Sequence, residues 1–373
     1  MKEPKVALIH DHLVQYGGAQ KTLEAISGIF PDAPIYTGLY KPDNISKYLN
    51  GKKIIYPKNY FLEKIPKYFS PIMPLIFESF DLRGYDLIIS DSSCWAKGVL
   101  TKPSQLHISY IHTPPRFLYK YSVESTKRNA WYFRPFVLII DMFLRAWDFS
   151  AAQRPDFLIS NSKEVQNRIK KFYSRESIVI NPPVEIEKNP KLGNAGDGNY
   201  YLSIGRLVAY KNFLPLIKAF NISGLPLVIA GTGPEEKMLK EVAKSNIKFE
   251  GKVSDEKKKE LIRGCLGLIN PVEDEDFGIV PIEALNFGKP VLVHKSGGHL
   301  ETVKENINGM FFDNLSAEVL SEKILEFDKK IKEKIFDPKE ISKSVENLSE
   351  ERFKKEFGDF VMEKFKLRQG VNA

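Results

Sequence analysis

The sequence Glu-Asp-Phe-Gly-Ile-Val-Pro-Ile-Glu-Ala-Leu occupies residues 275–285 and follows the apolar segment Gly267–Ile269. An apolar segment that leads through a glycine turn into an apolar helix is typical of a strand–turn–helix unit in a parallel sheet. The N–H groups of 278–280 are expected to be open donors at the helix N-terminus, which is an anion-binding position. The carboxylates of Glu275 and Glu283 flank this turn. The stretch therefore suits a ligand that carries both a diphosphate and hydroxyl groups.

A second stretch supplies the opposite charge. Residues 201–207 are predicted to form a buried strand that ends in Gly205 and Arg206, and Lys211 lies near the start of the next helix. An arginine binds phosphate with two parallel hydrogen bonds, and a lysine acts on it as a point charge. Two cations beside a helix N-terminus would stabilise a leaving diphosphate.

The order of predicted elements gives the fold class. Apolar segments of strand length alternate with helical patterns, and this alternation predicts parallel sheets with helices on both faces. The pattern is interrupted by the polar, glycine-containing stretch 185–199 and then starts again. We therefore predict an α/β protein with two Rossmann-like domains facing a cleft, at residues 1–185 and 199–345.

Composition excludes several classes of protein. The chain has 373 residues, a net charge of +8 and no DNA- or RNA-binding motif, so a nucleic-acid partner is not expected. Its two cysteines, Cys94 and Cys265, are far apart, so neither a disulfide framework nor a zinc site is expected. A signal peptide is not expected, and charged residues interrupt the longest apolar run, 133–147. We expect a cytoplasmic protein. The alternative location is a peripheral one at the inner face of the cell membrane.

Further candidate residues follow other predicted strands. The strand Val6–Ile9 leads into His10–His12 and then into the pair Gly17–Gly18. A glycine pair there lets a helix N-terminus meet a phosphate, and a plain turn explains it equally well. His112 ends a predicted strand before a proline-stiffened turn that ends at Arg116. Such a position suits a cleft, whereas a lone histidine is more commonly structural.

Two later stretches have contrasting interpretations. The turn Gly231–Gly233 follows an apolar strand and suits the approach of a nucleotide to the backbone, an interpretation that its neighbours favour over a tight connection alone. The run Lys257–Lys259 lies on a charged helix that Ser254 can cap, and we interpret it as a solvated face.

Two regions raise the question of a membrane. Residues 57–82 interleave aromatic side chains with lysines and prolines, a composition that can lie at a membrane surface. We favour an irregular, packed segment there. Residues 130–153 are predicted to form a long helix with a broad apolar face. The sequence leaves open whether either region contacts a membrane.

These residues resemble a known family. The Glu-x7-Glu spacing of Glu275 and Glu283, with Gly205-Arg206 and Lys211 before it, is similar to the retaining nucleotide-sugar glycosyltransferases of family 4. The resemblance covers about 6–313 and is weaker across 50–80 and after 330. It implies the GT-B architecture, with the final helix, about 350–367, returning to the first domain.

Motifs in the first half narrow the resemblance. The run 110–116 with Tyr119, the triplet His10–His12 and the stretch 96–100 resemble bacterial O-antigen mannosyltransferases of this family. This implies GDP-mannose as donor and a lipid-linked oligosaccharide as acceptor, in surface polysaccharide synthesis. One departure is Asn212, where related sequences often have a basic residue after the lysine.

The residues and the resemblance together assign a candidate site. By the family pattern, the second domain holds the donor and attack occurs on the front face of the sugar. The candidates are catalytic His112, Arg206, Lys211 and Glu275; donor-binding Gly17, Gly18, Gly233, Phe277, Gly278, Ile279, Val280 and Glu283; and, more weakly, acceptor-side Asp11, His12 and Arg116. No cofactor or metal is predicted, because Arg206 and Lys211 supply the charge that a metal would bring.

Three alternatives remain open at this point. A transferase of the same family that uses a UDP-sugar would keep the fold and the mechanism. A sugar-nucleotide-binding subunit of a polysaccharide assembly complex would lack transfer activity. The joint presence of five candidates argues against it: His112, Arg206, Lys211, Glu275 and Glu283. A nucleotide-sugar epimerase on the same fold would release no nucleotide in response to acceptor.

Overall fold

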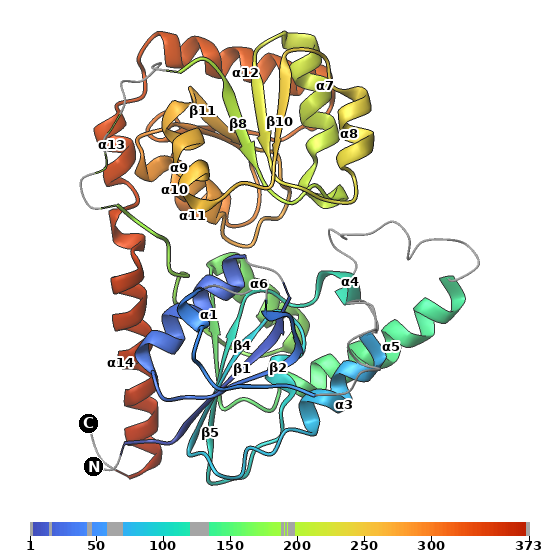
Figure 1. Ribbon diagram of the computed structural model, residues 1–373, viewed down its shortest axis with the longest axis vertical. Coiled ribbons are helices and arrows are strands. Elements are labelled where there is room, and N and C mark those ends of the chain that lie inside the picture. The colour runs from blue at the N-terminus through green and yellow to red at the C-terminus, as the bar shows by residue number, and fades with distance from the viewer. Residues whose placement is uncertain are drawn as a thin grey trace. The chain divides into compact units, whose positions relative to one another are not determined.

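The computed structural model describes residues 3–14, 17–42, 47–57, 70–119, 134–187, 190, 192 and 198–370. The described chain forms two compact units (Figure 1). Unit 1 contains the described residues up to Pro183 together with those from Glu350 onward, and unit 2 runs from Val184 to Ser349. Most of the aromatic and basic residues of 57–82, and the start of the helix predicted over 130–153, lie outside the described residues.

Unit 1 is built on a seven-stranded sheet in which every described pairing is parallel, in the order β3-β2-β1-β4-β5-β6-β7. Its strands are β1 (Val6–Leu13), β2 (Ile35–Tyr40), β3 (Ile54–Ile55), β4 (Leu87–Ser92), β5 (Leu106–Ile111), β6 (Phe157–Ser160) and β7 (Ile178–Val179). Its helices are α1 (Gly18–Ile29), α3 (Met73–Glu78), α4 (Arg116–Tyr119), α5 (Arg134–Ala151), α6 (Lys163–Tyr173) and α14 (Glu350–Arg368), with short 3-10 turns η2 (Lys47–Leu49), η3 (Ser70–Ile72) and η4 (Ala96–Gly98).

Apolar side chains cover both faces of this sheet. On one face α1 and α14 pack together over β1, β4 and β5, and α14 contributes the buried Phe353, Phe357 and Val361. On the other face α3, η4 and α5 bury a second cluster that includes Phe77 and Trp95. The C-terminal helix is therefore part of the core of the first unit.

Unit 2 repeats this architecture with a six-stranded parallel sheet in the order β10-β9-β8-β11-β12-β13. Its strands are β8 (Tyr201–Ile204), β9 (Leu227–Ala230), β10 (Ile247–Gly251), β11 (Gly267–Asn270), β12 (Val291–His294) and β13 (Gly309–Phe312). Its helices are α7 (Phe213–Ser223), α8 (Glu236–Val242), α9 (Asp255–Gly264), α10 (Ile279–Asn286), α11 (His299–Thr302), α12 (Ala317–Lys332) and α13 (Pro338–Lys343), with 3-10 turns η6 (Ala209–Lys211) and η7 (Glu346–Leu348).

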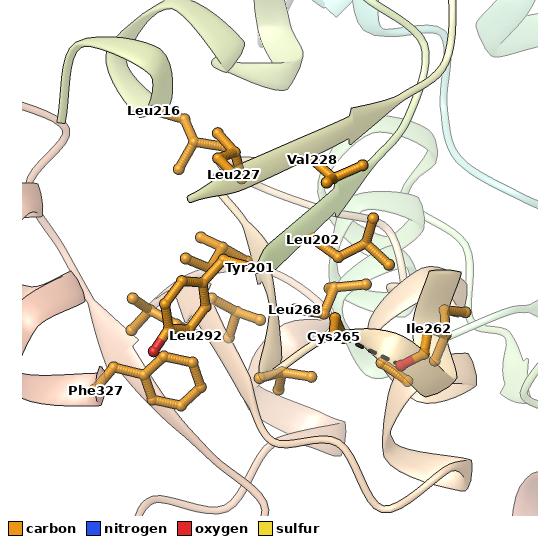
Figure 2. Close-up of a cluster of buried hydrophobic side chains, with 14 of the residues drawn as sticks. Tyr201, Leu202, Leu216, Leu227, Val228, Ile262, Cys265, Leu268, Leu292 and Phe327 are labelled. Atoms are coloured by element: carbon orange, nitrogen blue, oxygen red, sulfur yellow. Dashed lines mark hydrogen bonds between the residues drawn. The ribbon is translucent and has the colours of Figure 1, made fainter. Parts of the chain in front are cut away.

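The core of unit 2 lies between the sheet and its helices. Figure 2 shows Leu202, Val228 and Leu268 on neighbouring strands, with Tyr201 and Phe327 on the other side. The Tyr201 hydroxyl donates to Asp328 at 2.8 Å, so the polar end of this buried ring is satisfied. Helix α9 starts with ordinary capping chemistry, since Ser254 Oγ accepts a hydrogen bond from the Lys257 N–H at 3.2 Å.

Each sheet has one point at which the strand order reverses. In unit 1 the order reverses between β1 and β4, and in unit 2 between β8 and β11. In open parallel sheets, ligands bind beyond the carboxyl ends of the strands at such a switch point. The prediction of two Rossmann-like α/β units is confirmed, and several of the candidate residues follow the strands that flank these two points.

Among the residues that the structure describes, no helix is both long enough and apolar enough to cross a bilayer.

Candidate functional site

The loops after β8 and β11 meet through an ion pair. Lys211 ends η6, and its Nζ lies 2.8 Å from Oε2 of Glu275 in the loop before α10. The two side chains are only 19% and 14% exposed. Arg206 lies between β8 and η6 and is partly buried. The structure thus brings together two of the predicted catalytic side chains at the switch point of unit 2.

Glycines hold the loop that carries Arg206. Gly231 has a φ of 138°, and a Cβ on it would lie 1.9 Å from the Gly205 carbonyl oxygen. A Cβ on Gly233 would lie 2.2 Å from the carbonyl oxygen of Leu207. Since no side chain fits at either position, the Gly231–Gly233 turn packs against the backbone of the Arg206 loop. The structure gives Gly233 this supporting role, and its predicted contact with a donor stays a prediction.

A second glycine pair supports the Glu275 loop in the same way. Gly297 has a φ of 59°, and a Cβ there would lie 2.4 Å from the Glu275 carbonyl oxygen. The N–H of Gly298 donates to that same oxygen at 2.7 Å. The turn that precedes α11 therefore supports the backbone of the Glu275 loop.

Helix α10 begins beside these loops. Gly278 is its N-cap with a φ of 88°, and no side chain in the described part of the chain caps this end. Phe277 is buried in the core of unit 2, whereas Ile279 and Val280 are partly buried. Backbone N–H groups at such a helix start are suited to an anion. The side chain of Phe277 anchors the turn, and its backbone leads into the anion-binding position.

His299 supports this turn from inside. It is fully buried, and its Cδ2 would lie 3.1 Å from a Cβ placed on Gly278. Its Nδ1 donates to the His294 carbonyl oxygen at 3.0 Å, and its Nε2 lies 3.2 Å from the amide nitrogen of Asn270. Burial lowers the pKa of His299, so the ring is neutral at physiological pH. The turn thus rests on a neutral, hydrogen-bonded ring.

Glu283 has a cationic partner that sequence reasoning missed. Lys258 Nζ lies 2.7 Å from Glu283 Oε1, and the side chains are 15% and 8% exposed. The interpretation of the whole run 257–259 as a solvated face is therefore wrong for Lys258. The signal was available, because helical spacing places Lys258 on the same face of α9 as the buried Leu261 and Ile262.

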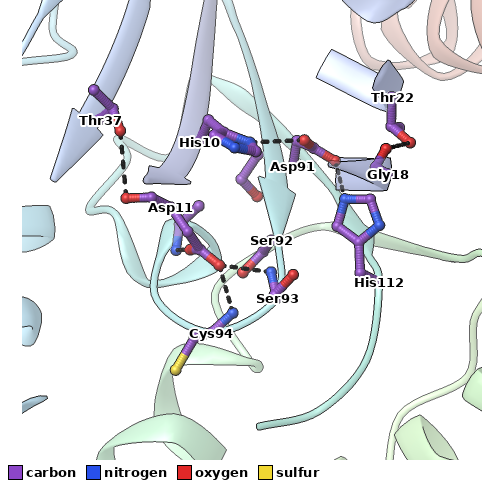
Figure 3. A network of polar contacts seen from close by, with 12 residues as sticks. His10, Asp11, Gly18, Thr22, Thr37, Asp91, Ser92, Ser93, Cys94 and His112 are labelled. Atoms are coloured by element: carbon purple, nitrogen blue, oxygen red, sulfur yellow. Dashed lines mark hydrogen bonds and ion pairs between the residues drawn. The ribbon is translucent and has the colours of Figure 1, made fainter. Parts of the chain in front are cut away.

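In unit 1 a buried carboxylate joins two histidines (Figure 3). Asp91 lies near the end of β4. Its Oδ2 is hydrogen-bonded to His10 Nδ1 at 2.8 Å, and its Oδ1 is hydrogen-bonded to His112 Nε2 at 2.6 Å. Burial alone would raise the pKa of Asp91, but the charges and hydrogen bonds of His112 and His10 lower it below its ordinary value. An ionised Asp91 therefore anchors the predicted catalytic His112. The sequence analysis singled out neither Asp91 nor this pairing.

Asp11 has a structural role that the sequence analysis did not predict. Its two oxygens accept the backbone N–H groups of Ser93, Cys94, Trp95 and Ala96 at 2.6–2.8 Å. This carboxylate therefore fixes the segment that follows β4 and leads into η4. Contact between Asp11 and an acceptor stays a prediction, and the four donors give the residue a structural function of its own.

The other candidates of unit 1 lie at the carboxyl side of the same sheet. Gly17 is the N-cap of α1, and Gly18 begins the helix. Among the described residues other than its chain neighbours, none has a heavy atom within 4 Å of where a Cβ on Gly17 would be. His12 lies near the end of β1, and Arg116 begins α4. Both side chains are partly buried. Within the described residues, no three His, Cys, Asp or Glu side chains are grouped to hold a metal ion.

Comparison with known proteins identifies a family model. Residues 184–340 match the model described as "Glycosyl transferases group 1". The O-antigen chain mannosyltransferase C of Escherichia coli is 29% identical over 168 residues, covering 41% of this chain and 43% of that protein. The alpha-1,3/1,6-mannosyltransferase ALG2 of Saccharomyces cerevisiae is 30% identical over 285 residues, covering 61% of this chain and 54% of that protein.

Solved structures show the same fold. The sucrose-phosphate synthase of Thermosynechococcus elongatus has a TM-score of 0.74 at 18% identity, over 97% of this chain and 99% of that one. The Anabaena HepE protein in complex with UDP and glucose has a TM-score of 0.69 at 17% identity, over 96% and 100%. The chain spans about half the length of the curated relatives it matches.

Proposed function

Because residues 184–340 belong to the Glycosyl transferases group 1 family, we propose that this protein is a retaining glycosyltransferase that uses a nucleotide-sugar donor. The transferred sugar is a hexose, with mannose from GDP-mannose as the first candidate. The acceptor is a lipid-linked saccharide in surface polysaccharide synthesis, such as O-antigen or capsule. The protein works in the cytoplasm at the inner face of the cell membrane.

The observation that carries this proposal is the Lys211–Glu275 ion pair at the switch point of unit 2. A cation and a carboxylate that are held together beside an uncapped helix start match a ligand with a diphosphate next to sugar hydroxyls. Two glycine turns pack against the backbones of both loops and support them.

Each residue then has a defined task. Arg206 and Lys211 stabilise the charge that develops on the diphosphate as the glycosidic bond breaks, with the N–H groups near Gly278. On donor binding, Glu275 exchanges part of its contact with Lys211 for hydroxyl groups of the sugar. Glu283 accepts hydrogen bonds from the ribose hydroxyls, and Lys258 holds its carboxylate in place. In unit 1, His112 hydrogen-bonds the saccharide. Gly17 and Gly18 place the N-terminus of α1 where it can bind a phosphate.

The relatives favour a mannosyl donor over the other hexoses. Both reported relatives are named mannosyltransferases, at about 30% identity. A UDP-sugar is the second candidate, since the HepE structure contains UDP and glucose at 17% identity. A non-catalytic sugar-nucleotide-binding subunit is the third, and it is disfavoured because every charged candidate residue is present.

Helix α5 supports a position at a membrane. Its exposed side chains include Leu138, Ile139, Met142 and Phe143, the last of which is 66% exposed. Its two carboxylates, Asp141 and Asp148, are buried. Within the described part of α5, the outward side is therefore apolar and presents no acidic group. Such a surface suits the boundary between lipid head groups and acyl chains, where a lipid-linked acceptor would be located.

The first experiment measures thermal stabilisation by GDP, UDP, ADP, GDP-mannose, UDP-glucose and UDP-N-acetylglucosamine. A ligand that binds only the folded protein raises the melting temperature by mass action. Stabilisation by GDP and GDP-mannose alone supports the mannosyl proposal. Stabilisation only by the uridine compounds replaces it with a UDP-sugar transferase, and no stabilisation by any compound contradicts the donor assignment.

The second experiment measures release of free nucleotide with and without a lipid-linked oligosaccharide. Release that depends on the acceptor supports transfer, and release that ignores it contradicts transfer. Nucleotide-sugar binding without any release supports the non-catalytic alternative. The assay is repeated with EDTA, because we propose a metal-independent enzyme, and loss of activity that magnesium restores would overturn that part.

A further inference from the structure

Two residues with an uncommon backbone conformation adjoin the Lys211–Glu275 ion pair in the sequence of unit 2. Asn212 follows Lys211 and has a φ of 55°, and Asp274 precedes Glu275 and has a φ of 52°. Five non-glycine residues in the described part of the chain have a left-handed φ, and these are two of them. Such a backbone is unfavourable for a residue with a Cβ and persists where surrounding contacts hold it. The two positions therefore direct attention to the contacts that fix these loops.

The side chain of Asn212 connects the Lys211 loop to the loop that carries Glu275. Its Nδ2 lies 3.0 Å from the carbonyl oxygen of Pro271, the residue that follows β11. A carbonyl oxygen only accepts hydrogen bonds, so the amide group must donate, and this fixes its orientation. Strands β8 and β11 are neighbours in the sheet, so this bond joins the loops that follow two adjacent strands.

The hydroxyl group of Ser296 holds the Glu275 loop from the other side. Ser296 Oγ accepts a hydrogen bond from the backbone N–H of Asp274 at 2.8 Å, and His294 Nδ1 lies 2.8 Å from the same oxygen. His294 ends β12, which is the neighbour of β11 on the side away from β8. The loop after β11 is therefore hydrogen-bonded to the loop after β8 and to the loop after β12.

The ion pair depends on the backbones that carry it. Lysine and glutamate side chains are long, and holding both in one geometry costs rotamer entropy. The Lys211 and Glu275 side chains nevertheless meet at 2.8 Å in the absence of a ligand. Asn212, Asp274 and Ser296 are all partly buried, so water competes less strongly for their hydrogen bonds.

We propose that Asn212 and Ser296 are positioning residues that hold the backbones of Lys211 and Glu275, so that the ammonium and carboxylate groups face each other before a donor binds. The identity of the donor rests on the proposed function. A site that is already held in its binding geometry loses less conformational freedom on binding, which raises its affinity for a sugar diphosphate. The role also accounts for the departure at position 212, because asparagine adopts a left-handed backbone more readily than a basic residue does.

NMR of the lysine ammonium groups tests the positioning role without a ligand. The Lys211 signal is assigned by its disappearance in a Lys211→Arg variant. We expect its protons to exchange with water at least about tenfold faster in Asn212→Gly and in Ser296→Ala, because the ion pair opens more often. An unchanged rate in either folded variant would overturn the role of that residue. A wild-type Lys211 group that exchanges as fast as the exposed Lys240 would overturn the proposal.

The two substitutions are chosen to remove one contact each. Glycine adopts a left-handed backbone readily, so Asn212→Gly keeps the conformation and removes the amide group. Ser296→Thr keeps the hydroxyl oxygen, and we expect its exchange rate to stay within about threefold of the wild type. Exchange as fast as in Ser296→Ala would show that the oxygen is not what holds Asp274.

Asn246→Gly is the matched control in the same unit. The Asn246 amide also donates to backbone carbonyls, those of Phe220 and Leu225, at 2.9 and 2.7 Å. It directly precedes β10, so it lies at the amino edge of the sheet, away from the ion pair. We expect this variant to lose stability while Lys211 exchange stays within about twofold of the wild type. Exchange as fast as in Asn212→Gly would indicate general loosening of unit 2 and would overturn the proposal.

Titrations with GDP-mannose and UDP-glucose measure the consequence for donor binding. For whichever compound binds the wild-type protein, we expect Kd to rise by about tenfold in Asn212→Gly and in Ser296→Ala. In Asn246→Gly it should stay within about twofold of the wild-type value. Wild-type affinity in both loop variants would overturn the link between loop geometry and binding.

The positioning role and the proposed function can fail separately. If neither compound binds the wild-type protein while both loop variants accelerate Lys211 exchange, the donor assignment fails and the positioning role stands. If a nucleotide sugar binds and is turned over while Lys211 exchange is unchanged in both variants, the positioning role fails and the transferase proposal stands.

Discussion

The Lys211 ammonium group is the cation that the structure places most directly at the candidate donor site. It lies 2.8 Å from the Glu275 carboxylate, with both side chains mostly buried. We expect Lys211→Ala to lower turnover by more than about tenfold, the effect of losing 1.4 kcal/mol of transition-state stabilisation. Lys240→Ala is the matched control, because that lysine also pairs with a glutamate at 2.7 Å but is 51% exposed. Near-normal turnover of Lys211→Ala would contradict its role.

The Lys258–Glu283 pair makes a prediction about stability that needs no ligand. Replacing Lys258 with methionine leaves a buried carboxylate without its cation, and we expect the free energy of unfolding to fall by about 3 kcal/mol. Lys257→Met is the control, because that side chain is exposed and pairs with Glu260 on the same helix. Its effect should stay within about 0.5 kcal/mol.

The double variant Lys258→Met, Glu283→Gln separates charge from packing. Removal of both charges should recover most of the loss in Lys258→Met, as measured by urea denaturation. A double variant that is as unstable as Lys258→Met would show that the aliphatic part of the lysine, and not its charge, is what matters.

Individual residues show which parts of the site the sequence could predict. Spacing identifies Glu275, Glu283 and Lys211, and the structure gives each of them a charged partner. Lys258 was also within reach, because its position on the apolar face of α9 follows from helical periodicity. Asp91 was not, since its role depends on the register of three parallel strands, which a single sequence does not specify.

At the scale of elements, strand β5 carries a histidine whose state depends on pH. His107 is fully buried, its Nε2 lies 2.9 Å from Ser90 Oγ, and burial lowers its pKa to about 3. The unfolded chain binds a proton below about pH 6.5 and the folded strand does not. Stability contributed by neutral His107 is therefore present above that pH and is lost as the pH falls from about 6.5 toward 3.

The variant His107→Gln removes this proton uptake while keeping a polar group near Ser90. Between pH 6 and 4, where the unfolded histidine is charged, we expect the fall in unfolding free energy to be shallower by up to about 1.4 kcal/mol per pH unit. Urea denaturation across this range measures the slope. Equal slopes for the variant and the wild type would show that His107 does not titrate between the two states.

Helix α5 is an element whose polar side faces inward. Asp148 forms an ion pair with the buried Lys97 at 2.5 Å, and the Trp147 indole donates to Glu78 at 2.7 Å. The motif 96–98 therefore has a packing function, since a Cβ on Gly98 would lie 2.4 Å from the Trp147 ring. These contacts hold the helix with its apolar side outward.

We expect the triple variant Ile139→Ser, Met142→Ser, Phe143→Ser to lose at least tenfold in binding to vesicles that contain anionic phospholipid. Each side chain would otherwise transfer apolar surface out of water, worth about 1.5–3 kcal/mol when burial is complete. Co-sedimentation measures the binding. The control replaces Ile222, Leu300 and Ile335, which are similarly exposed on unit 2, with serine. Equal binding by both triple variants would contradict a specific role for α5.

The glycine turns show a limit of prediction at the element scale. The sequence places the turn Gly231–Gly233 correctly between a strand and a helix. It does not reveal that a Cβ there would collide with the backbone of a loop from another strand. Such a collision is a tertiary contact, so the same glycine pattern suits both a ligand and a supporting backbone.

At the scale of the whole molecule, the two units share one topology but differ in how the chain completes them. Unit 2 is continuous from Val184 to Ser349. Unit 1 uses the start of the chain and also α14, whose Phe353 and Phe357 rings are fully buried against α1 and β5. The switch-point residues of unit 1 therefore depend on residues at the far end of the sequence, since Phe353 also packs against Tyr110, which holds His112.

This dependence gives a matched pair of substitutions. Phe357 and Phe336 are both almost fully buried, in the cores of unit 1 and unit 2 respectively. Each change to alanine should cost about 3–5 kcal/mol. Although Phe357 follows unit 2 in the sequence, we expect Phe357→Ala to raise hydrogen exchange in β1, β4 and β5 and to leave β8 and β11 protected. Phe336→Ala should do the reverse. Loss of protection in both sheets from either substitution would show that the two units unfold as one cooperative body, and a donor bound to unit 2 would then also stabilise the histidine cluster of unit 1.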